Sequence, residues 1–253
     1  MVSLDKITTN GKTVFLAYDQ GMEHGPSDFD DQNVDPNYVL QIGTECAFNA
    51  VIFQKGIAEK YYTGSQYATK IPLIVKLNGK TGLVTENDPY SPQICTVEEA
   101  LSLGAVAVGY TIYIGSEFEQ KMFAEFAQIE RDAHAKDIPT IVWMYPRGKA
   151  TEGKEKKDLI AYGGRVALEL GADMVKLHYP GNQEAMKWVV EAAGKTKVVV
   201  AGGVKATDED FLALVKSIMD AGACGMAVGR NIWQSKDPGE ISKKIKDIVF
   251  AKQ

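Results

Sequence analysis

The most constraining feature of this sequence is the repeated alternation of short apolar runs with amphipathic segments from residue 13 onward. The runs are rich in β-branched residues and mostly uninterrupted by polar ones, which predicts strands covered on both faces. Buried strands that alternate with helices are typical of a parallel sheet. We expect strands at residues 13–19, 50–53, 72–77, 105–112, 139–145, 174–179, 197–203 and 225–230.

Eight such units in 253 residues predict an α/β fold, a single-domain (β/α)8 TIM barrel. The alternative is an open doubly wound sheet, but the turn after the first run lacks Gly-x-Gly-x-x-Gly. No linker divides the chain, so residues 1–253 are expected to form one domain, with residues 1–12 covering the barrel. Ser116 is expected to cap a long helix that ends near Ala135.

Charge and cysteine content exclude several classes of protein. The net charge of −5 and the absence of a dense basic run argue against nucleic-acid binding. No apolar run reaches the roughly 18 residues of a membrane helix, and the N-terminus lacks a signal-peptide pattern. Three widely spaced cysteines fit a reducing compartment, so we expect a cytoplasmic protein.

In a barrel of this kind the working residues follow the carboxyl ends of the strands. That rule makes a short set of candidates from six of the expected strands. They are Asp19, Lys76, Trp143, Tyr145, Arg147, Lys176, His178, Gly202, Gly203, Gly229 and Arg230.

Lys176 stands inside an apolar strand, on the same face as Met174 and His178. Burial of an unpaired ammonium is costly and lowers the lysine pKa, which produces the neutral amine that Schiff-base chemistry needs. The alternative is a lysine that reaches solvent or pairs with a carboxylate. Lys76 satisfies the same pattern, and periodicity does not separate the two.

Two glycine-containing turns follow the seventh and eighth strands, at Gly202-Gly203 and Gly229-Arg230. Glycines let backbone N–H groups approach an anion, and this position is a frequent phosphate site in barrels. Arg230 can add a charge-assisted hydrogen bond. The alternative is that the glycines only make tight turns. We expect a phosphorylated small molecule as the ligand.

Tyr145 and Trp143 share one face of the fifth strand. Tyr145 can act as a general acid or base if its surroundings move its pKa towards neutrality, whereas Trp143 either shapes a pocket or packs in the barrel. Asp19 either caps a turn or moves protons. Glu23 and His24 are expected in a loop, with a structural or substrate-orienting role.

A metal site is not expected. The sequence has three histidines and neither His-x-His nor His-Glu-x-x-His, so zinc would need His24, His178 and a carboxylate to converge. No cofactor motif is present.

Five segments resemble the archaeal-type class I fructose-1,6-bisphosphate aldolases. They are Leu16-Ala-Tyr-Asp-Gln-Gly-Met-Glu-His-Gly-Pro26, Trp143-Met-Tyr-Pro-Arg-Gly148, Val175-Lys-Leu-His-Tyr179, Ala201-Gly-Gly203 and Val228-Gly-Arg-Asn231. The similarity spans the chain in order. The first segment is the most specific of the five, and its Glu-His-Gly-Pro ending favours the bisphosphate aldolase over related enzymes of the superfamily.

The resemblance implies metal-independent, reversible cleavage of fructose 1,6-bisphosphate to dihydroxyacetone phosphate and glyceraldehyde 3-phosphate. Lys176 would form the Schiff base, Tyr145 would exchange the C4 hydroxyl proton, and Asp19 would assist proton transfer. Trp143 would shape the pocket. The resemblance places the C1 phosphate on Gly202, Gly203, Gly229 and Arg230, and the far phosphate on Arg147. It also implies a homo-oligomer.

Three alternatives remain open. One is another Schiff-base lyase or transaldolase-type enzyme that acts on a different phosphorylated sugar. The second is a barrel isomerase of phosphorylated amino-acid precursors that uses carboxylates. The third is a barrel that binds a sugar phosphate without turning it over.

Overall fold

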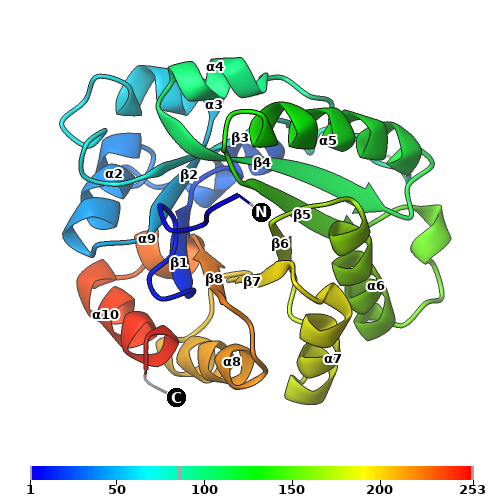
Figure 1. The fold of residues 1–253 in the computed structure, drawn as a ribbon. Coiled ribbons are helices and arrows are strands. Elements are labelled where there is room, and N and C mark those ends of the chain that lie inside the picture. The colour runs from blue at the N-terminus through cyan, green and yellow to red at the C-terminus, as the bar shows by residue number, and fades with distance from the viewer. Residues whose placement is uncertain (1, 85–86, 252–253) are drawn as a thin grey trace.

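The computed structural model describes residues 2–84 and 87–251. Within these ranges eight parallel strands close into a barrel in chain order, as the sequence predicted (Figure 1). Each strand pairs with its neighbours in sequence, and β8 pairs with β1 through Leu16 and Val228. The strands are β1 Thr13–Ala17, β2 Ala50–Gln54, β3 Leu73–Lys76, β4 Ala105–Ile114, β5 Thr140–Pro146, β6 Met174–Leu177, β7 Lys197–Ala201 and β8 Gly225–Val228.

Helices surround the barrel and connect its strands (Figure 1). The α-helices are α1 Gly21–His24, α2 Pro36–Glu45, α3 Lys55–Ile57, α4 Val97–Ser102, α5 Glu119–His134, α6 Lys156–Glu169, α7 Gln183–Ala193, α8 Asp208–Asp220, α9 Arg230–Trp233 and α10 Pro238–Val249. Gly25–Asp28 (η1) and Lys149–Thr151 (η3) are 3-10 turns, and Ala58–Tyr62 (η2) is a π-helix.

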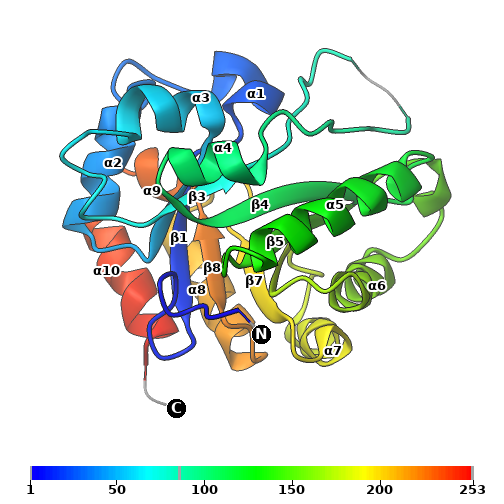
Figure 2. The same cartoon turned by 45° about the horizontal axis from the view of Figure 1, so that its top comes forward.

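Two apolar clusters form the core. The larger lies between the sheet and its helices, and the smaller fills the barrel interior with inward residues of the strands, such as Phe15, Ile52 and Met174. Ile7 belongs to the interior cluster and is fully buried. Its carbonyl accepts a hydrogen bond of 2.7 Å from Thr13 Oγ1 at the start of β1. The N-terminal segment therefore packs at the barrel end opposite the carboxyl ends of the strands (Figure 2).

Several expected boundaries differ from those of the structure, among them the start of the long helix and the end of the first strand. The long helix begins at Glu119, with Phe118 as its N-cap in place of Ser116. Ser116 Oγ donates to Pro89 O at 2.8 Å in the loop after β3 and accepts from Phe118 N at 3.2 Å. The first strand ends at Ala17, and Glu23 lies on the short helix α1 instead of in a loop. Asp19 therefore stands in the turn between β1 and α1, where its carboxylate can turn into the barrel mouth.

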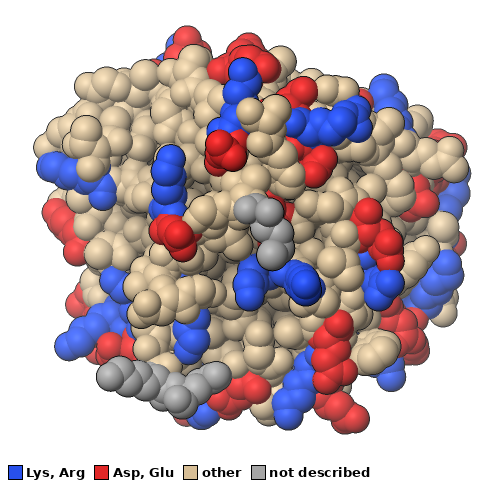
Figure 3. Space-filling view, viewed as in Figure 1, with Lys and Arg blue, Asp and Glu red and all other residues tan. Residues whose placement is uncertain are grey.

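No helix in the described part of the chain is both long and apolar enough to cross a membrane. The face that carries the N-terminal segment mixes acidic and basic side chains (Figure 3). No large patch of one sign appears on that face.

Candidate active site

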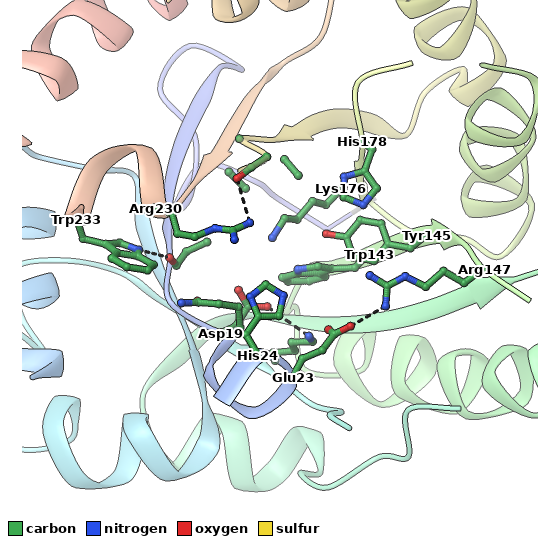
Figure 4. A pocket seen from close by; sticks show the side chains of 18 residues that line it. Asp19, Glu23, His24, Trp143, Tyr145, Arg147, Lys176, His178, Arg230 and Trp233 are labelled. Carbon is green, nitrogen blue, oxygen red and sulfur yellow. Dashed lines mark hydrogen bonds and ion pairs between the residues drawn. The ribbon is translucent and has the colours of Figure 1, made fainter. Parts of the chain in front are cut away.

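A cavity opens at the carboxyl ends of the strands, where Glu23 and His24 of α1 form part of its wall (Figure 4). Every site residue predicted from the sequence lines it, together with Lys76, Glu23, His24 and His178. The full lining is Ala17, Asp19, Gln20, Glu23, His24, Lys76, Trp143, Tyr145, Arg147, Lys176, His178, Ala201, Gly202, Gly203, Ala227, Gly229, Arg230 and Trp233.

Lys176 is 6% exposed and points into this cavity from β6, on the same face of the strand as Met174 in the barrel interior. Its Nζ lies 5.0 Å from the centre of the Trp143 ring, which stands beside it in register on β5. Burial lowers the pKa of the Lys176 amine, and Lys76 adds to the effect, while Asp19 opposes it. A larger share of the amine is therefore neutral at neutral pH than for an exposed lysine.

Asp19 interacts with both of the lysines that the sequence pattern could not separate. Its Oδ2 is 3.4 Å from Lys76 Nζ, and both side chains are buried. Burial acts to raise the pKa of Asp19, but the charges of Lys176 and Lys76 outweigh it and lower the pKa. Asp19 is thus an ionised carboxylate. Lys76 forms the direct ion pair, whereas Lys176 forms none among the described residues.

Tyr145 projects into the cavity from the end of β5 and stacks on His178, with ring centres 4.4 Å apart. Burial, Asp19 and Glu23 raise the pKa of Tyr145 well above its ordinary value. From the sequence, a role in proton transfer required a Tyr145 pKa moved towards neutrality. The free protein does not meet that condition. Burial and the nearby Lys176 charge lower the pKa of His178 to about 4, so its imidazole is neutral at physiological pH.

The two glycine turns lie together at one end of the cavity. Asn231, 1% exposed, connects them: its Nδ2 donates to Gly202 O at 2.9 Å, and its Oδ1 accepts from Ala206 N at 2.9 Å. Gly203 adopts φ +73°, which favours glycine. Arg230 Nη2 lies 3.4 Å from Gly203 O. The turns and the guanidinium thus form a cationic, backbone-lined recess.

Arg147 lies at the other side of the cavity, with Lys176 between it and Arg230 (Figure 4). Its Nη1 donates to Glu23 Oε1 at 2.6 Å, and its guanidinium lies 5.1 Å from the ring centre of Tyr113. Two cationic ends with a buried lysine between them suit a ligand with anionic groups at its two ends.

Comparison with known proteins identifies the family. Residues 13–235 match the DeoC/LacD family aldolases. The chain belongs to this family.

Individual relatives agree with this assignment. The chain is 50% identical over 243 residues to the fructose-bisphosphate aldolase class 1 of Thermoproteus tenax, covering 95% of this chain and 90% of that one. It is 44% identical over 246 residues to the enzyme of the same name from Halobacterium salinarum, with coverages of 96% and 92%. The resemblance inferred from five segments is confirmed.

Solved structures match over almost the whole barrel. A crystal structure of an archaeal fructose 1,6-bisphosphate aldolase has a TM-score of 0.91 and 48% identity, covering 98% of this chain and 97% of that one. A second structure has the catalytic lysine covalently bound to the carbinolamine intermediate of its substrate. It matches with a TM-score of 0.90 and 48% identity, and covers 97% of each chain.

Three features of the site were missed from sequence. Asn231 was read only as part of a motif, although a buried asparagine between two loops is a frequent scaffold residue. His178 was a candidate without a role. The pairing of Glu23 with Arg147 had no sequence signal, because it joins side chains 124 positions apart. Among the described residues, no group of three His, Cys, Asp or Glu side chains could hold a metal ion.

Proposed function

We propose that the chain is a class I fructose-1,6-bisphosphate aldolase in which Lys176 carries the Schiff base. One observation carries the proposal: a buried lysine with a lowered pKa lies between two cationic ends of a single cavity. Its relatives from Thermoproteus tenax and Halobacterium salinarum are fructose-bisphosphate aldolases of the same class.

The neutral Lys176 amine attacks the C2 carbonyl of the sugar and forms a carbinolamine. Loss of water gives an iminium, whose positive charge accepts the electron pair of the C3–C4 bond as that bond breaks. Asp19, an ionised carboxylate near both lysines, assists proton transfer at the carbinolamine. Trp143 shapes the wall beside the amine, and its buried Nε1 donates to no group among the described residues.

Tyr145 exchanges the proton of the C4 hydroxyl. In the free protein it is a neutral phenol, so it must release its own proton before it can accept another. We place that release at the loss of water from the carbinolamine, where the phenol proton passes to the departing hydroxyl group and leaves Tyr145 as the phenolate. The iminium then brings a fixed positive charge into the cavity, which lowers the phenol pKa at the step where a base is required.

The phosphates occupy the two ends. The C1 phosphate lies on Gly202, Gly203, Gly229 and Arg230, where two loops are held together by Asn231. The far phosphate lies near Arg147. This orientation of the substrate puts C2 of the sugar beside Lys176.

We also propose where the protein is located and how it assembles. We propose a cytoplasmic protein, because Cys46, Cys95 and Cys224 are free thiols. A homo-oligomer is also proposed, since Tyr162 on α6 and Trp188 on α7 are 62% and 59% exposed aromatic side chains on adjacent helices. Light scattering during size-exclusion chromatography measures the assembly state. Binding of nucleic acid or membranes is not expected.

A trapping experiment tests the function. The protein is incubated with dihydroxyacetone phosphate, reduced with borohydride and digested, and the modified peptide is identified by mass spectrometry. We expect the adduct on Lys176. An adduct on Lys76 would reassign the nucleophile, and the absence of any adduct would sink the Schiff-base mechanism.

Two assays separate the remaining alternatives. Cleavage of fructose 1,6-bisphosphate that persists in EDTA supports a metal-independent route, whereas its loss and recovery with a divalent cation contradicts that route. Trapping without cleavage, together with transfer of the three-carbon unit to another aldehyde, would favour the transaldolase-type enzyme.

A further inference from the structure

The two arginines of the cavity differ in how closely carboxylates hold them. Arg147 Nη1 lies 2.6 Å from Glu23 Oε1, whereas Arg230 Nη1 lies 3.4 Å from Asp28 Oδ1. Asp28 is itself 2.6 Å from His24 Nδ1, so its carboxylate is shared with the imidazole. Arg230 can therefore take up an anion with little rearrangement, while Arg147 already has a carboxylate as a close partner.

Glu23 is held in place by its backbone. Its N–H donates to Gln20 O at 3.0 Å within the turn that begins α1. On its other side lies the loop after β3, where a Cβ added to Gly82 would be 2.4 Å from Glu23 O. The carboxylate is 23% exposed and lines the cavity. The backbone of Glu23 is thus held in place, and its carboxylate lies beside Arg147 at the far end of the cavity.

Burial acts to raise the pKa of Glu23, but its hydrogen bond and ion pair with Arg147 outweigh burial and lower it. The side chain is therefore ionised when a ligand arrives. A substrate phosphate that reaches Arg147 meets the Glu23 carboxylate on the same guanidinium. Two anions on one cation repel each other, and the weaker partner must move away.

We infer that Glu23 determines specificity by competing with the far phosphate of the substrate for Arg147. The inference rests on the proposed function and concerns its choice of substrate. A hydroxyl at the far end can donate a hydrogen bond to Glu23 and leave the ion pair intact, whereas a phosphate must displace the carboxylate. Glu23 thus lowers the preference of the enzyme for fructose 1,6-bisphosphate over fructose 1-phosphate.

The alternative role for Glu23 is purely structural, as an anchor of α1. The two roles predict different kinetics. An anchor supports both substrates equally, so its loss lowers activity on both by the same factor. A competitor for Arg147 acts on one substrate, the one with a far phosphate. Effects of Glu23 on the pKa of Tyr145 act on both substrates and cancel in a ratio.

The decisive measurement is the ratio of kcat/KM for fructose 1,6-bisphosphate to that for fructose 1-phosphate. For Glu23→Gln, which keeps the shape and removes the charge, we expect the ratio to rise roughly three- to fivefold, as for a partly exposed ion pair. The rise in this ratio should come mainly from a lower KM for the bisphosphate. Arg147→Met should lower the ratio, and adding it to Glu23→Gln should abolish the gain.

Glu169→Gln is the matched control. Glu169 forms a similar pair with Arg165, at 2.7 Å, but both side chains are exposed on α6. This variant should leave the ratio unchanged. An unchanged ratio for Glu23→Gln, or an equal loss of activity on both sugars, would contradict the inference. If the protein still forms the Lys176 adduct with dihydroxyacetone phosphate, the proposed function stands even so. If the unaltered protein forms no adduct and cleaves neither sugar, the proposed function fails and the inference with it.

Discussion

The indole of Trp143 lies directly against the backbone of Gly109 on the neighbouring strand. A Cβ added to Gly109 would lie 1.9 Å from Trp143 Cζ3, which is a severe overlap. Gly109 pairs in register with Lys76 on β3, while Trp143 pairs with Lys176 on β6. One glycine in β4 therefore sets the position of the aromatic ring between the two lysine-bearing strands.

Gly109→Ala should displace the Trp143 ring and so disturb the wall beside Lys176. We expect a loss of stability of roughly 1–3 kcal/mol, typical of overpacking in a core, and at least a tenfold loss of kcat/KM. Chemical denaturation and steady-state kinetics measure the two effects. Gly56→Ala is the control, since a Cβ there meets nothing within 4 Å. Full activity of Gly109→Ala would show that the ring position is unimportant.

Tyr145→Phe removes the phenol and keeps the ring that stacks on His178. We expect cleavage to fall roughly 10²- to 10⁴-fold, the usual contribution of a general acid–base group. The borohydride-trapped adduct with dihydroxyacetone phosphate should still form on Lys176, though more slowly. Turnover equal to that of the unaltered protein would remove Tyr145 from proton transfer.

Substitutions of Asp19 and of Lys76 should shift the acid limb of the pH–rate profile of adduct formation in opposite directions. The charge of Asp19 raises the pKa of Lys176, and that of Lys76 lowers it. Asp19→Asn should therefore move the acid limb to lower pH, and Lys76→Met should move it to higher pH, by roughly one unit each. The rate of borohydride trapping, measured at a series of pH values, tests this. Shifts of the same sign would contradict the assigned charges.

Asn231→Ala should weaken the recess formed by the two glycine turns. It leaves Gly202 O and Ala206 N without the amide that joins them. We expect a loss of stability of roughly 1–3 kcal/mol, together with weaker binding of inorganic phosphate as a competitive inhibitor. Asn37→Ala is a suitable control because Asn37 is exposed at the start of α2. An unchanged inhibition constant would mean that phosphate binds elsewhere.

Sequence reasoning succeeded where one strand or one turn carries the signal. The order of the eight strands follows from the apolar runs, and the two-residue period of a strand places Lys176 on the same face as Met174. Sequence reasoning failed where the surroundings of a side chain are set by residues far away in the chain. Ser116 Oγ donates to Pro89 O, and the following helix is capped at Phe118 instead. The raised pKa of Tyr145 depends on burial and on the charges of Asp19 and Glu23, which no local pattern places beside it.

By itself, then, the sequence determined the barrel and the residues that reach its mouth, because burial on both faces requires near-continuous apolar strands. Its periodicity left Lys76 and Lys176 equivalent, and the family resemblance selected Lys176. The tertiary structure distinguished their surroundings: Asp19 pairs directly with Lys76, while the Lys176 amine lies over Trp143. It also decided that Glu23 meets Arg147. Charges and pKa values depend on distances between separate loops, and no local pattern in the chain encodes those distances.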